Sequence, residues 1–92
     1  MNDPIRFRRS AVTLVRNVGA EVLLTAAGND DIDRLSGTAA AIWHVLEVPR
    51  TSAEVAHLVA GSFGEEDRIV MADVEAFLAE LLQRGWVEPV SR

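Results

Sequence analysis

The apolar positions in the first third of the chain form short runs bounded by turn residues. Two β-rich runs, at residues 12–16 and 21–25, are separated by a short loop that contains Gly19. Such a pair predicts a β-hairpin. Turn residues at 27–30 then precede residues 31–35, where polar and apolar positions alternate as they do in a strand. The charges of this third segment favour an edge strand, because charged side chains discourage unwanted pairing at a sheet edge.

After this segment the apolar residues recur with a helical period. Ser36 can cap a helix over residues 37–46, and Pro49 prevents its continuation. Thr51 and Glu54 have the spacing of a capping box, which predicts a second helix to about residue 60, ended by Gly61 or Gly64. The expected inward stripes of these two helices are Ala39, Ile42, Trp43 and Leu46, and Val55, Leu58 and Val59.

A third helix is predicted over about residues 66–84, with an acidic first turn that suits the positive end of the helix dipole. Gly85 follows as its terminator, and residues 86–90 read as a short extended tail in which Trp86 covers the end of the bundle. The inward stripe of this helix is Val70, Val74, Phe77, Leu78 and Leu81. The predicted fold class is therefore α+β: an N-terminal three-stranded antiparallel sheet followed by a three-helix, winged-helix-like unit.

The composition fits one domain. The chain has 92 residues, 49% of them hydrophobic, and we expect a single domain over 1–92 with its core at about 12–87 and flexible residues 1–10. The absence of cysteine excludes a disulfide scaffold, a thiolate zinc site and a cysteine nucleophile. No apolar stretch is long enough to span a membrane and the first residues lack the pattern of a signal peptide, so we expect a cytoplasmic protein without a membrane partner.

Catalytic and metal-binding patterns are absent from the sequence. His44 and His57 fall on different predicted helices, without further ligands at suitable spacing, so no metal is expected. Asp30, Asp31 and Asp33 lack the glycine and glutamate of a calcium loop and fit a turn plus an edge strand better. Neither a nucleophile elbow nor a glycine-rich phosphate loop occurs. We therefore expect no enzyme and no cofactor.

The distribution of charge bears on nucleic-acid binding. The net charge is −5, and the predicted third helix carries more acidic than basic residues, which phosphate would repel. Four arginines, Arg6, Arg8, Arg9 and Arg16, lie near the N-terminus. No nucleic-acid partner is expected, but a winged-helix DNA-binding regulator remains an alternative function. A non-catalytic subunit of an enzyme complex is another.

The predicted edge strand at residues 31–35 can accept a peptide. Its outer N–H and C=O groups can pair with an added strand, while side chains of the peptide enter a groove formed with the last helix. The other interpretation is that this edge is covered by its own chain. The residues by themselves leave both interpretations open.

Several runs, in this order and spacing, resemble the PqqD-like family over roughly residues 12–87. They are VLL at 22–24, LS at 35–36, TAAAIW at 38–43, RTSAEV at 50–55, DVEAFL at 73–78 and LLQRGWV at 81–87. The resemblance implies a recognition element for ribosomally synthesised, post-translationally modified peptides. Such a domain binds the leader of a precursor peptide as a strand added beside its third strand, against its third helix. It then presents the leader to a maturation enzyme such as a radical SAM protein or a leader peptidase.

Carried onto this chain, the resemblance implies a binding strand and a helix wall. The implied peptide-binding residues are Asp31, Ile32, Asp33, Arg34 and Leu35 on the strand and Val70, Asp73, Val74 and Phe77 on the helix. Asp31 and Asp33 could pair with basic residues of a leader, and Arg34 with an acidic one.

The chain departs from the family pattern at two places. Ser36-Gly37 stands where the family usually has Asn before the first helix, and residues 26–29 (AAGN) replace the Tyr-Pro-Glu-Gly-like turn of members dedicated to pyrroloquinoline quinone. The second departure favours a relative that serves another product, such as a lasso peptide.

Overall fold

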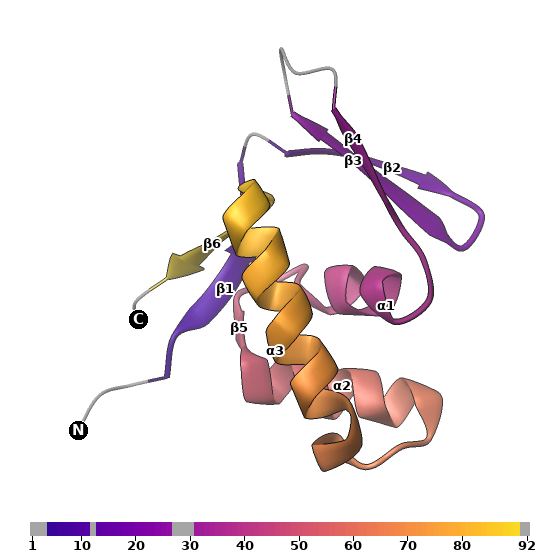
Figure 1. Cartoon of the computed structure of the whole chain (residues 1–92), viewed down its shortest axis with the longest axis vertical. Coiled ribbons are helices and arrows are strands. Elements are labelled where there is room, and N and C mark those ends of the chain that lie inside the picture. Colours follow the sequence, from indigo (N-terminus) through magenta and orange to yellow (C-terminus); the bar gives the residue numbers. More distant parts are fainter. Residues whose placement is uncertain (1–3, 12, 27–30, 91–92) are drawn as a thin grey trace.

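The computed structural model describes residues 4–11, 13–26 and 31–90. A sheet of three strands projects from a body of three helices and a second small sheet (Figure 1). The elements in chain order are β1 (Arg6–Arg9), β2 (Thr13–Val18), β3 (Glu21–Ala26), β4 (Ile32–Leu35), α1 (Gly37–Val45), β5 (Arg50–Thr51), α2 (Ser52–Phe63), α3 (Asp67–Arg84) and β6 (Val87–Val90).

The projecting sheet has the order β2-β3-β4 and is antiparallel throughout. Val18 pairs with Glu21 across a two-residue turn, in which Gly19 has a φ of 60°, a value that glycine adopts without steric cost. Val22 and Leu24 of β3 are fully buried, so this face of the sheet turns toward the helices. The predicted hairpin and third strand are therefore confirmed, while Val12 and the predicted turn at 27–30 lie outside the described residues.

The second sheet has the order β5-β1-β6, and β1 and β5 are not among the predicted elements. Its central strand β1 runs antiparallel to β6, with Arg6 opposite Val90 and Arg9 opposite Val87. Arg9 also donates from Nη2 to the carbonyl oxygen of Trp43 at 2.7 Å, and its guanidinium lies 4.7 Å from the centre of the Trp43 ring. Residues 6–9, expected to be flexible, thus all pair with β6, and Arg6 and Phe7 also pair with β5.

The helix ends follow local signals with two corrections. Thr51 and Glu54 form the predicted capping box: Thr51 Oγ1 accepts from the Glu54 amide at 3.1 Å, and the Thr51 amide donates to Glu54 Oε1 at 2.8 Å. Ser36 occupies the N-cap position of α1, but its side chain makes no capping hydrogen bond. Gly61 lies inside α2, and Gly64 ends that helix in the left-handed conformation.

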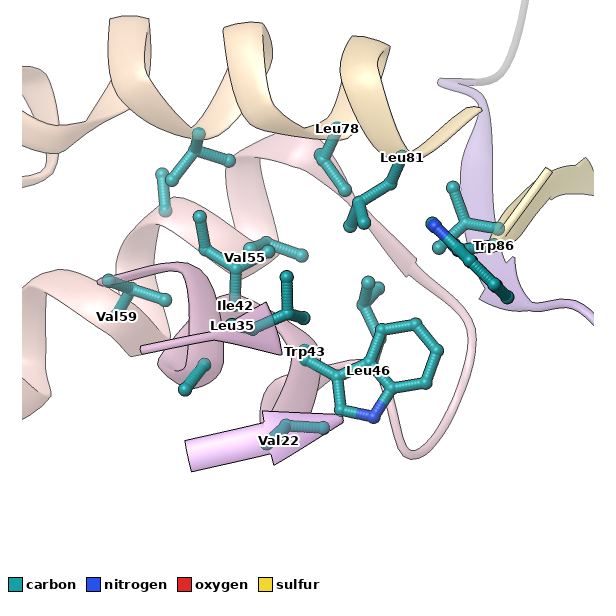
Figure 2. Close-up of a cluster of buried hydrophobic side chains, with 14 of the residues drawn as sticks. Val22, Leu35, Ile42, Trp43, Leu46, Val55, Val59, Leu78, Leu81 and Trp86 are labelled. Atoms are coloured by element: carbon teal, nitrogen blue, oxygen red, sulfur yellow. The ribbon is translucent and has the colours of Figure 1, made fainter. Parts of the chain in front are cut away.

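The core lies where the three helices meet the inner face of β3 and β4. Figure 2 shows Ile42 and Trp43 of α1 and its C-cap residue Leu46 converging with side chains of α2 and α3, with Trp86 at one end. All these residues are buried, as predicted for both tryptophans. Leu58 differs from its prediction because it is 37% exposed, and Ala56 is buried in α2 instead.

The predicted α+β class is confirmed, with the sheet and the three helices in the predicted order. Within the described residues, no helix has the length and apolar character needed to cross a membrane.

Candidate functional site

Strand β4 forms one edge of the projecting sheet. It pairs with β3 on one side, and no described strand pairs with its other side. Asp33 and Leu35 turn inward, opposite the buried Leu24 and Val22, whereas Ile32 and Arg34 are exposed on the outer face. The backbone groups along the free edge can therefore accept another strand.

A groove runs beside this edge, with β4 and the start of α1 on one side and α3 on the other. Its central part is lined by Asp33, Arg34, Leu35, Ser36, Ala39, Phe77, Glu80, Leu81 and Arg84. The α3 members that face it, Phe77, Glu80 and Arg84, recur at spacings of three and four residues and so share one face of the helix. An extended chain lying along β4 would place its inward side chains in this groove.

The groove continues in both directions from this central part. Toward the sheet, a hollow is lined by Ala26, Asp31, Ile32, Asp33, Arg84, Gly85 and Trp86. Toward the helices, a hollow is lined by Thr38, Ala39, Ile42, Asp73, Ala76, Phe77 and Glu80. Since neighbouring hollows share residues, the three form one continuous surface beside α3 from Asp73 to its C-terminal end.

Asp33 connects β4 to the end of α3. Its carboxylate accepts from Arg84 Nη1 at 2.8 Å through Oδ1 and from the Trp86 indole N–H through Oδ2. Arg84 also lies 3.5 Å from Glu80 through Nη2. This arrangement places the inward carboxylate of β4 between two donors and so links the strand to the C-terminal end of α3.

The outward arginine of β4 is also paired. Arg34 lies 3.7 Å from Glu21 on the neighbouring strand, and both side chains are largely exposed. The two charged groups that the sequence assigns to ion pairs with a leader, Asp33 and Arg34, thus already have partners within the chain. For Asp31, which lines the sheet-side hollow, that assignment stays a prediction.

The structure divides the predicted site residues into two groups. Asp31, Ile32, Asp33, Arg34, Leu35, Asp73 and Phe77 line the groove. Val70 and Val74 instead point into the core, with Val74 fully buried, because they lie on the side of α3 that faces α2 and α1. The groove wall at that level is formed by Asp73 and Ala76 instead of the two valines.

The groove lining also includes residues that were not predicted, among them Ala39, Glu80, Arg84 and Trp86. The i, i+4, i+7 spacing from Asp73 through Phe77 to Glu80 was the available signal, since it marks one face of the helix. The contact between Asp33 and Arg84 joins residues 51 positions apart, and no local pattern indicates it.

The described residues contain no group of three or more His, Cys, Asp or Glu side chains placed to hold a metal ion. The site is therefore described by its strand edge, its apolar floor and its charges.

A free strand edge beside a helix-walled groove defines a class of small α+β domain suited to holding an extended chain. A family model described as coenzyme PQQ synthesis protein D (PqqD) matches residues 21–87, most of the chain, so the protein belongs to the PqqD family. No curated protein sequence matches significantly.

One solved structure supports the same fold. "TbiB1 in Complex with the TbiA(beta) Leader Peptide" matches with a TM-score of 0.78 and 20% sequence identity, over 88% of this chain and 94% of that one. At 20% sequence identity, this likeness concerns the fold alone.

Proposed function

We propose that this protein binds the leader segment of a ribosomally synthesised precursor peptide as a strand added to β4, and presents it to a maturation enzyme. The observation that carries the proposal is the free edge of β4 beside a continuous groove, in a chain of the PqqD family. The similarly folded TbiB1 was solved in complex with a leader peptide, which supports the same ligand class here.

The physical basis of binding differs between the two parts of the site. Main-chain hydrogen bonds along β4 contribute affinity for any extended peptide, and alternate side chains entering the groove contribute specificity. Phe77 and Ala39 provide apolar surface there. Exposed ion pairs contribute only about 0–1 kcal/mol each, so strand pairing and buried apolar contacts supply most of the affinity.

Presentation follows from where the leader would lie. A peptide on β4 is held at the surface, and the residues that continue beyond the groove remain accessible to a second protein. We propose a radical SAM protein or a leader peptidase as that partner. We also propose that the precursor gives a product other than pyrroloquinoline quinone, such as a lasso peptide.

An NMR titration of the labelled protein with the leader of a precursor encoded beside its gene tests the binding step. We expect saturable shifts on residues 31–35 and on the groove face of α3. If duplex DNA or a neighbouring enzyme without peptide shifts the spectrum instead, the protein is a regulator or a structural subunit.

Proline substitutions test strand addition itself. Ile32→Pro and Asp33→Pro each remove one N–H of β4, and one of the two points toward the added strand, since neighbouring N–H groups of a strand point to opposite edges. We expect that one to abolish leader binding in the titration. Because Asp33→Pro also deletes a carboxylate, Asp33→Ala separates the two effects.

The opposite edge of the sheet supplies the control. Leu14→Pro and Val15→Pro make the same changes on β2 and are expected to leave leader binding intact. If both prolines on β4 bind the leader normally in folded protein, the peptide does not add to this strand.

A further inference from the structure

The helix-side end of the groove lies beyond the last residue of β4. All of its lining residues belong to α1 or α3: Thr38, Ala39, Ile42, Asp73, Ala76, Phe77 and Glu80. Two of these carry carboxylates and none carries a positive charge. We call this part of the groove the acidic end.

Asp73 has no counter-ion among the described residues. In the part of the chain that the structure describes, no cationic group lies within ion-pair distance of its carboxylate, whereas Asp33, Glu80 and Arg34 are each paired. Its helix neighbours at three and four residues are Ile69, Val70, Ala76 and Phe77, none of them charged. Asp73 also lies more than one turn inside α3, where the helix dipole no longer compensates a negative charge.

Aspartate is also an unfavourable choice at this position of the helix. It forms helices less readily than alanine or glutamate, because its short side chain competes with the backbone for hydrogen bonds. At the middle of α3 it caps nothing and neutralises nothing. A residue that lowers helix stability and makes no stabilising contact within the fold is expected at a position that serves binding.

The shape around Asp73 suits an amphipathic cation. Ala39 and Ala76 are small and leave room between the helices, and Phe77 adds an apolar wall. The hydrocarbon stem of a lysine or arginine can lie along such a surface while its charged group stays at the solvent-exposed rim. There it meets Asp73, with Glu80 two turns further along α3.

We propose that the acidic end receives a lysine or arginine side chain of the bound peptide, with Asp73 as its counter-ion. This proposal rests on the proposed function and adds a specificity to it: the leader carries a basic residue just outside the segment that pairs with β4. Asp73 is then a residue that selects among leaders, and strand pairing is common to all of them.

A random peptide library displayed on its own messenger RNA tests this without knowledge of the natural leader. Wild-type protein and the Asp73→Asn variant are used as baits, and Glu75→Gln is the control, since Glu75 lies on another face of the same helix. We expect lysine or arginine to be enriched at one position of the peptides selected by wild type and Glu75→Gln. The enrichment is expected to disappear with Asp73→Asn.

One selected peptide is then measured by fluorescence anisotropy. Asp73→Asn, or replacement of the basic peptide residue by norleucine, is expected to weaken binding about three- to fivefold, the range of a partly exposed ion pair. The two changes together are expected to cost no more than either alone, because they remove the same contact. Additive losses would overturn the pairing.

The outcomes separate this proposal from the function on which it rests. In one outcome, the selected peptides fail to bind the β4 proline variants but show no preference for a basic residue. This result overturns the proposal for the acidic end and leaves strand addition in place. Selected peptides whose binding ignores the β4 prolines overturn both. If Asp73→Asn selects basic residues as strongly as wild type does, the basic side chain binds at another residue, and the proposal is also overturned.

Discussion

At the scale of single residues, the two helix N-caps show how much one side chain contributes. Thr51 satisfies an amide of the first turn of α2 and has its own amide satisfied by Glu54. Ser36 stands at the equivalent position of α1, but its hydroxyl makes no capping hydrogen bond. The same residue class at the same helix position therefore has different energetic roles in this protein.

The capping box gives the first prediction at this scale. Thr51→Ala is expected to lower the free energy of unfolding by about 1 kcal/mol, because an amide of α2 loses its partner. Ser36→Ala is the matched control and is expected to cost much less. Urea unfolding followed by circular dichroism measures both, and equal losses would show that capping hydrogen bonds do not account for the difference.

Glu54 makes this contribution dependent on pH. The backbone hydrogen bond from Thr51 lowers the pKa of Glu54 below its ordinary value of 4.5, with smaller help from Arg6 and Arg50. A lowered folded-state pKa means that the stabilisation is complete above 4.5 and is lost as the pH falls through the folded value. The stability difference between wild type and Glu54→Ala is therefore expected to shrink between pH 6 and pH 3. A difference that stays constant or grows on acidification would contradict this assignment.

At the scale of elements, the groove has two sides. Strand β4 and helix α1 form one side, and the exposed face of α3 forms the other. Asp33, Arg84 and Trp86 hold its two sides together at the sheet end. Ala39 and Ala76 keep it open at the helix end. The width of the groove thus depends on the two hydrogen bonds of Asp33 and on two small side chains.

Filling the groove is expected to block binding without unfolding the protein. Ala76 is exposed on α3, so Ala76→Trp adds a large side chain to the groove wall and disturbs no buried contact. We expect leader affinity to fall at least about tenfold, or 1.4 kcal/mol. Ala79→Trp makes the same change on another face of α3 and is expected to bind normally. Anisotropy with a labelled leader compares them, and undiminished binding by Ala76→Trp would place the peptide elsewhere.

At the scale of the whole molecule, the fold is completed by a strand that the sequence does not reveal. The run Arg6-Phe7-Arg8-Arg9 is mostly charged and predicts a solvated end. It becomes the centre of a sheet because β6 and β5 supply partners far along the chain, and Phe7 packs against the core.

Substitution of Phe7 tests whether β1 is an integral part of the fold. Phe7 is half-buried, so Phe7→Ala is expected to cost about 2 kcal/mol, below the 3–5 kcal/mol of a fully buried phenylalanine. Arg8→Ala, which removes only an exposed pair with Glu88, is expected to change stability by less than about 0.5 kcal/mol. If thermal unfolding shows no loss for Phe7→Ala, the N-terminal strand does not contribute to the folded state.

The sequence predicts the features of this molecule that are encoded locally. The hairpin around Gly19, the capping box and the stop at Gly85 are all read from a few neighbouring residues, and all three are present. Contacts between distant segments escape this reading. The pairing of β1 with β6 and the contact of Asp33 with Arg84 depend on the assembled fold.

The same distinction applies to the site. The strand and one face of the third helix were predicted, but the assignment of helix residues was shifted toward the core at Val70 and Val74. Apolar type alone does not separate a core residue from a groove residue on the same helix, because both kinds recur with the helical period. The neighbouring elements decide it, since α2 covers one side of α3 and leaves the other open.

The register of β1 against β6 has a consequence for protein engineering. Arg6 lies opposite Val90, so the entry and exit points of the domain are adjacent, while the groove begins at Trp86, at the opposite end of β6. A domain with adjacent ends can be inserted into a surface loop of another protein, or its ends can be joined and reopened elsewhere. Fused to a modifying enzyme in this way, the groove would remain open, and each substrate peptide would be held at high local concentration beside the catalyst.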